Sequence, residues 1–394
     1  MIQQSRRLQS IDVFRAVTMF FMIFVNDVDG VKNIPVWIGH VDRYTDGLGF
    51  ADTIFPAFLF IVGLSIPFAL NKRMHSNENR GKITLHICLR SLALIVMGFF
   101  HVNLENYSET ALLPEPVFEI LATLAFFLIW LDYKPATNKI KQNVLQVVGV
   151  AILIVLFFLY KGNKHGEIVG MRPQWWGILG LIGWAYLTCS LVYLFSKGRL
   201  SILVPVLVLF LVYNTINQTF ILDSFSDILK YFWPLNTGSE VSLIMAGIII
   251  SVIYKQYIGG SKQRFFLTML MAATIMIVLG FLIRPFGGIS KIDATPSWAC
   301  ICICISIAVF TLLVYLVDVK QKANWFKIIK PAGTSTLTCY LIPYFLYSFL
   351  WLFHFNYPWF LNEGSGGILR SFAIAFIVIL ITGFLEEKHI RLKI

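Results

Sequence analysis

Apolar runs of about 18 residues or more recur along the whole chain, and this pattern constrains the fold more than any other feature. A helix needs about 20 mostly apolar residues to cross the hydrocarbon core of a bilayer. Of the 394 residues, 57% are hydrophobic and 13% are charged, whereas a soluble domain carries about 25% charged residues. The sequence therefore predicts an all-α, polytopic integral membrane protein.

We predict eleven or twelve transmembrane helices in a single domain that covers residues 1–394, because the polar segments between the runs are too short for a separate soluble domain. The twelve candidate segments are 11–27, 50–70, 83–101, 116–131, 143–160, 174–195, 201–219, 239–257, 265–284, 297–317, 334–353 and 367–385.

The distribution of basic residues predicts the orientation of these helices. If both termini lie in the cytoplasm, the inward segments hold 21 of the 32 Lys and Arg residues. Cytoplasmic loops of membrane proteins carry this excess of positive charge. We therefore predict a multi-pass protein of the cell (inner) membrane with both termini in the cytoplasm, and the loop after the first helix lies outside.

The net charge of +11 does not indicate nucleic-acid binding, because the basic residues lie in short clusters between apolar runs. No zinc-binding spacing of His or Cys is present, and the six cysteines all lie in apolar runs. The sequence therefore predicts no metal site, no disulfide and no nucleic-acid partner.

Ionisable residues inside membrane spans are costly and are candidates for function. Asp12 and Arg15 lie three residues apart in the first predicted helix, so they share one helix face. This pair is either a structural ion pair or a contact for an anionic ligand that enters from the cytoplasm. Asn26 lies near the external end of the same helix, where its amide either caps the helix or binds a ligand.

The first external loop contains a single histidine, His40, and several acids. Most loop histidines are simply solvated, but an imidazole titrates near neutral pH and can accept a proton from an attacking group. Asp42 and Asp46 are close enough in the chain to orient it. Asp52 opens the second predicted helix, where an acid stabilises a helix N-terminus or belongs to a site.

The segment RLQSIDVFRAVTMFFMIFVNDVDG, a loop histidine and then DGLGFADTIFPAFLFIVGLSIPFAL resemble the heparan-α-glucosaminide N-acetyltransferases. Weaker similarities are RSLALIVMG, KIDATPSW, VDVK and PAGTSTLTCYL, and QWWGILGLIGWAYL is similar to an uncharacterised bacterial branch of this superfamily. The resemblance covers most of the chain, is strongest over residues 6–130 and is most specific over residues 6–70.

The resemblance implies an acyltransferase that takes an acetyl group from cytoplasmic acetyl-CoA and places it on an amino sugar or related glycan outside. It implies that His40 is catalytic, with Asn26 beside it. We expect both to be catalytic, His40 as the base and Asn26 as the donor to the developing oxyanion. A covalent acetyl-histidine intermediate is the alternative to direct transfer. Asp12, Arg15, Asp52 and Lys291 match further positions and are expected to contact substrate. The partners are then acyl-CoA, a glycan acceptor and membrane lipid, and a homodimer is compatible with the sequence.

The chain departs from the family pattern in the first external loop, where HVDRYTDGLG replaces an aromatic-rich segment. Ser335 stands where the family has an asparagine. Two other functions remain open: a sugar or muropeptide transporter, which twelve helices would suit, and an inactive relative that serves as a membrane partner.

Overall fold

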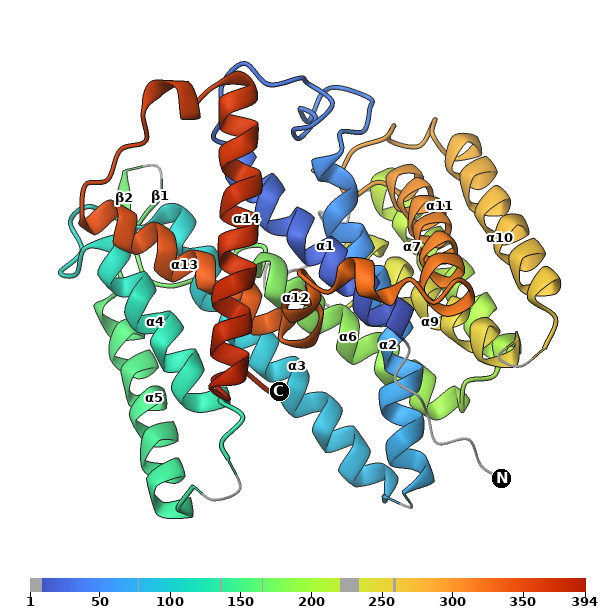
Figure 1. The fold of residues 1–394 in the computed structure, drawn as a ribbon, viewed down its shortest axis with the longest axis horizontal. Helices are drawn as coiled ribbons and strands as arrows, with labels where there is room; N and C mark the ends of the chain where they lie inside the picture. The colour runs from blue at the N-terminus through green and yellow to red at the C-terminus, as the bar shows by residue number, and fades with distance from the viewer. Residues whose placement is uncertain (1–8, 77, 135–136, 165, 220–233, 258–259) are drawn as a thin grey trace.

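The computed structural model describes residues 9–76, 78–134, 137–164, 166–219, 234–257 and 260–394. Each of the twelve predicted segments forms a long helix (Figure 1). These helices are α1 (Gln9–Val28), α2 (Ala51–His75), α3 (Arg80–Val102), α4 (Glu115–Trp130), α5 (Lys139–Leu159), α6 (Gly177–Ser196), α7 (Leu200–Thr219), α9 (Ser239–Tyr257), α10 (Lys262–Leu282), α11 (Pro296–Leu313), α13 (Thr336–Leu352) and α14 (Gly364–Glu387).

Short elements connect or extend these helices. A π-helical turn (Val314–Val319) continues α11, and the short helix α12 (Lys330–Thr334) precedes α13. The two strands β1 (Gly162–Lys164) and β2 (Glu167–Val169) form a small antiparallel hairpin. In the described parts of the chain, 3₁₀ turns cover Asn103–Asn106, Ala323–Phe326 and Trp359–Leu361.

Within the described residues, nine helices are long and apolar enough to cross a membrane. α13 is apolar but shorter, with 17 residues. The outer helices α5 and α10 expose large apolar side chains along their length, such as Val147, Phe158 and Leu270. Such faces suit lipid rather than water. The chain is thus an all-α polytopic membrane protein, as the sequence predicted.

The innermost helix is α9, whose apolar segment is 78% buried. It packs against α2 at two glycines that face each other. A Cβ atom on Gly63 would overlap the carbonyl oxygen of Ile244, and one on Gly247 would overlap that of Phe60. Glycine permits this close backbone approach, which is a common way for membrane helices to pack without a hydrophobic driving force.

Gly247→Ala is expected to destabilise the fold by about 1–3 kcal/mol, because the new methyl group forces α2 and α9 apart. The measurement is thermal unfolding of the purified protein in detergent. Gly170→Ala is the matched control, because a Cβ atom there meets nothing within 4 Å. Equal melting temperatures for the two variants would contradict the close packing.

Helix α1 runs obliquely through the middle of the bundle and contacts α2, α12 and α14 (Figure 1). The loop 29–50 between α1 and α2 lies at the top of the view. The first residues of α1, the connection between α2 and α3 and the C-terminal residues lie toward the opposite side. The termini of the described bundle therefore share the side away from loop 29–50.

Candidate functional site

Three of the sequence-predicted residues meet where loop 29–50 reaches α2. The Nδ1 atom of His40 lies 2.7 Å from Oδ1 of Asp52, which is the second residue of α2. The Nζ atom of Lys291 lies 3.1 Å from Nδ1 and 3.2 Å from Nε2 of His40, although the two residues are 251 positions apart. Lys291 comes from the connection between α10 and α11. His40, Asp52 and Lys291 together are called the histidine cluster.

Asp52 is the buried member of the histidine cluster, with 2% of its side chain exposed against 31% for His40. Its Oδ2 atom accepts hydrogen bonds from the backbone N–H groups of Val41 (3.1 Å) and Gly49 (3.0 Å). An ionised carboxylate only accepts, so the short contact at Oδ1 assigns the proton to Nδ1 of His40. The Nε2 atom of His40 then carries the lone pair, and the Nζ atom of Lys291 contacts it at 3.2 Å.

The backbone positions the Asp52 carboxylate. Asp52 lies in the first turn of α2, as the sequence indicated, but no side chain forms a capping hydrogen bond there. The Asp52 side chain binds the loop. The backbone N–H of Phe50 donates to the carbonyl of Trp37 (2.7 Å), which folds the loop back onto α2. The buried indole of Trp298 in α11 donates to the Asp52 carbonyl oxygen (3.2 Å).

Lys291 adds a positive charge at the exposed edge of the histidine cluster. Its Nζ atom is 4.0 Å from Oδ1 of Asp52, and 29% of its side chain is exposed. Burial lowers the pKa of the Lys291 ammonium group, whereas the nearby Asp52 carboxylate acts in the opposite direction. A cationic donor therefore lies next to Nε2 of His40.

Two further ion pairs fasten loop 29–50 to the 283–295 connection, and we call them the loop latch. Asp46 accepts hydrogen bonds from Arg284 (2.8 Å) and from the backbone N–H of Ile289 (2.7 Å). The hydrogen bond from Ile289 lowers the pKa of the Asp46 carboxyl group most strongly, with a smaller contribution from Arg284. Arg43 pairs with Asp293 at 2.7 Å.

The loop latch changes one prediction from the sequence. Asp42 and Asp46 are nearer to His40 in the chain, but Asp46 binds Arg284, and the carboxylate that contacts His40 belongs to Asp52. The loop latch instead fixes the segment that carries Lys291 against the loop that carries His40. It thereby holds two parts of the histidine cluster together.

Asn26 does not join the hydrogen bonds of the histidine cluster. Its side chain is exposed to a cavity of about 180 Å³ between α1, α4 and α13. Glu119 of α4 lines the same cavity together with Tyr340, Tyr344 and Tyr347 of α13. Glu119 was missed by the sequence analysis, although an acid inside the apolar run 116–131 was a visible signal.

Asp12 and Arg15 form the ion pair that their spacing indicated, at 3.1 Å. Arg15 also donates to the carbonyl oxygen of Gly333 (3.0 Å) and to the hydroxyl of Ser65 in α2 (2.7 Å). Arg15 therefore links α1, α2 and α12. Structural and ligand roles are compatible here, since both Asp12 and Arg15 line a second cavity.

The second cavity is the larger one, at about 580 Å³, and is lined by α1, α2, α3, α6 and the 333–340 segment. Four basic side chains face it: Arg15, Lys72, Arg90 and Lys393. Its volume lies in the range of about 300–1,000 Å³ that is typical of small-molecule sites. Met22 and Tyr340 line both cavities, so the two adjoin along α1.

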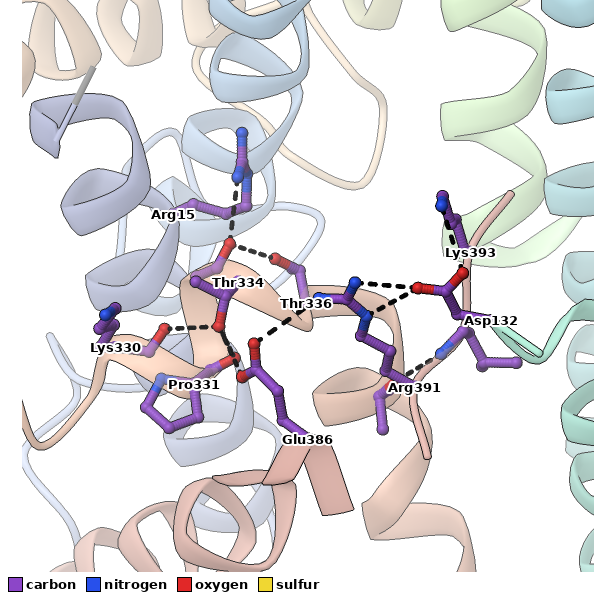
Figure 2. A network of polar contacts seen from close by, with 12 residues as sticks. Arg15, Asp132, Lys330, Pro331, Thr334, Thr336, Glu386, Arg391 and Lys393 are labelled. Atoms are coloured by element: carbon purple, nitrogen blue, oxygen red, sulfur yellow. Dashed lines mark hydrogen bonds and ion pairs between the residues drawn. The ribbon is translucent and has the colours of Figure 1, made fainter. Parts of the chain in front are cut away.

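The C-terminal residues form one wall of the larger cavity, and a polar network fixes them there (Figure 2). Asp132 accepts hydrogen bonds from Arg391 (2.9 and 3.0 Å) and Lys393 (3.2 Å). Burial opposes ionisation of Asp132, but these bonds outweigh it and lower the pKa of its carboxyl group. Thr334 donates to Glu386 at 2.7 Å, which ties α12 to the end of α14.

A profile of the family described as "Domain of unknown function (DUF5009)" matches residues 7–233, more than half of the chain. The chain belongs to this family. The matched region contains Asp12, Arg15, Asn26, His40 and Asp52. Lys291 lies outside the matched region of this DUF5009 protein, so the histidine cluster combines matched and unmatched parts of the chain.

Two curated relatives of this DUF5009 protein support the resemblance that the sequence indicated. Heparan-alpha-glucosaminide N-acetyltransferase of Homo sapiens is 33% identical over 198 residues, which are 46% of this chain and 26% of the human protein. The Mus musculus protein of the same name is 32% identical over 192 residues, 45% of this chain and 25% of the mouse protein. The matched segment thus spans about a quarter of each relative's length.

Proposed function

We propose that this DUF5009 protein is a membrane-embedded acyltransferase that moves an acetyl group from cytoplasmic acetyl-CoA to an amino sugar or related glycan outside. The observation that carries the proposal is the histidine cluster, in which a buried carboxylate orients an imidazole beside a lysine. The similarity to two proteins named N-acetyltransferases supports the same reaction. The excess of basic residues in the predicted inward segments supports a cytoplasmic location for both termini.

In the proposed reaction, Nε2 of His40 accepts a proton from the acceptor amine as its nitrogen attacks the thioester carbonyl. Asp52 holds the ring through Nδ1 and stabilises the imidazolium that forms. Lys291 donates to the oxyanion that develops on the carbonyl oxygen. When the carbon–sulfur bond breaks, the imidazolium returns its proton to the CoA thiolate, so the imidazole is regenerated.

The larger cavity is the proposed site of the donor. Acetyl-CoA carries several phosphate charges, and four basic side chains line this cavity. Arg15 is paired with Asp12 and Lys393 with Asp132, and Lys72 and Arg90 add further positive charge. The C-terminal residues Leu392, Lys393 and Ile394 line this cavity, and the predicted orientation assigns them to the cytoplasm. In this proposal Asn26 faces the smaller cavity, where its amide contacts a substrate rather than the His40 ring.

The test is an assay of the purified protein in lipid nanodiscs with acetyl-CoA and a panel of amino sugars. We expect release of free CoA thiol that depends on the acceptor, with an acetylated product detected by mass spectrometry. Neither thiol release nor product with any acceptor would contradict the proposal.

A transporter of sugars or muropeptides is the second candidate, and one observation favours it. The two cavities share Met22 and Tyr340, so together they extend along much of α1. A transporter would show saturable sugar uptake into vesicles without acetyl-CoA. An acyltransferase would show no uptake under these conditions, and its product would form only when the donor is present.

A further inference from the structure

Glu119 is an acid within the apolar helix α4 that the proposed acyl transfer does not use. It lies in the second turn of α4 and lines the cavity of about 180 Å³. One of its carboxylate oxygens, Oε2, accepts a hydrogen bond from Ser348 of α13. An ionisable side chain inside a membrane helix is costly and usually faces a binding site or a partner.

No basic side chain pairs with Glu119 among the residues that the structure describes. Asp27, the residue after Asn26 in α1, has its own cation, since Arg370 lies 3.1 Å from it. Asp27 also accepts a hydrogen bond from Tyr347 (2.6 Å). The negative charge at Asp27 is therefore compensated within the protein, whereas the charge of an ionised Glu119 faces the cavity.

The remaining walls of this cavity suit a cation. Tyr340, Tyr344 and Tyr347 supply aromatic rings, and ring faces attract positive charge. The Tyr340 and Tyr344 hydroxyls contact each other at 3.3 Å, and the buried His101 ring stacks on Tyr344 at 3.9 Å, which fixes this wall. The Asn26 side chain offers a carbonyl oxygen that, within the described residues, accepts no hydrogen bond.

We propose that the Glu119 cavity is a binding site for a primary ammonium group. The ammonium ion would pair with the Glu119 carboxylate, donate to the Asn26 amide oxygen and lie against the tyrosine rings. The cavity is smaller than the roughly 300–1,000 Å³ of sites for drug-sized ligands. It therefore accepts a small amine or the amine-bearing end of a larger molecule.

This site concerns binding and does not depend on acyl transfer. If the chain transfers acyl groups, the Glu119 cavity adjoins the proposed donor cavity at Met22 and Tyr340. If it does not, the ammonium site remains. A failure of one proposal is therefore distinguishable from a failure of the other.

The test compares two ligands of nearly the same shape, cyclohexylammonium and neutral cyclohexanol, by calorimetric titration of the protein in nanodiscs at neutral pH. We expect the ammonium ion to bind at least about tenfold more tightly. Glu119→Gln keeps an acceptor for Ser348 but removes the charge, and it should abolish this preference. Glu115→Gln is the matched control, because Glu115 is exposed one turn earlier in α4 and does not line the cavity.

A second measurement needs no variant and so remains informative if Glu119→Gln fails to fold. Carbodiimides label carboxyl groups buried in membrane proteins, and mass spectrometry locates the adduct. Because an activated carboxyl group also couples with a primary amine, the readout is the sum of carbodiimide adduct and cyclohexylamide at Glu119. Cyclohexylammonium should lower this sum by at least about tenfold, and cyclohexanol should not. Equal affinity for the two ligands, or equal labelling with both, would overturn the proposal.

Discussion

His40→Ala is expected to lower acetyl transfer by about 10²–10⁴-fold, the usual contribution of a positioned general base. The variant loses the only imidazole that the structure places against Asp52 and Lys291. Binding of CoA, measured by calorimetry, should change little, because the proposed donor cavity is lined by other residues. Turnover is measured as acceptor-dependent release of CoA thiol.

The matched control is His354→Asn, which removes a histidine beyond the end of α13. The backbone of His354 has a positive φ of 50°, a conformation that asparagine tolerates better than alanine does. This variant should retain near-normal turnover. The catalytic role of His40 would be wrong if His40→Ala turned over as fast as His354→Asn. A loss of folding in His40→Ala, with CoA binding lost as well, would mean a structural role.

Asp52→Asn is expected to reduce turnover by a similar factor, on the order of 10²–10⁴, because it removes the negative charge that orients and stabilises the imidazolium. The asparagine side chain also has a single carbonyl oxygen for three donors: His40, Val41 and Gly49. At least one of these three donors then faces the amide N–H group of the asparagine and loses its acceptor. The measurement is kcat with saturating acetyl-CoA, with the KM for acetyl-CoA as a second readout.

Asp46→Asn tests whether turnover depends on the Asp52 carboxylate beside the His40 imidazole or only on an ordered loop. It weakens the exposed loop latch to Arg284 but leaves the His40–Asp52 contact in place. Exposed ion pairs are each worth about 0–1 kcal/mol, so a small effect on turnover is expected. If Asp46→Asn and Asp52→Asn lost activity equally, the loop as a whole, rather than the Asp52 carboxylate, would control the reaction.

The helices were predictable because each apolar run must satisfy its backbone groups internally within lipid. Their ends were less certain. The segment 334–353 reads as one run, but the chain breaks at Ser335, where φ is −124° and ψ is 47°. Arg15 donates a hydrogen bond to the carbonyl oxygen of Gly333 at this break. The pattern of apolar residues does not predict that contact.

The histidine cluster was predictable only in part. The resemblance indicated His40, Asp52 and Lys291 separately, but only the fold places Lys291 beside His40 across 251 positions. Sequence proximity favoured Asp42 and Asp46 as partners of His40, and it misled because the loop folds back through the bond between Phe50 and Trp37. The cavity at Glu119 could not be predicted from the sequence either, since α1, α4 and α13 form it together.

The loop latch has a consequence for how such a protein can diversify. Asp46 pairs with Arg284 and Arg43 pairs with Asp293, so each of these charges has its partner more than two hundred positions away in the chain. If one residue of a pair is replaced by a residue of opposite charge, two like charges face each other. The repulsion remains until the partner residue is replaced as well. Remodelling of loop 29–50 should therefore appear as paired substitutions in loop 29–50 and the 283–295 connection, inherited together across a gap of more than two hundred residues.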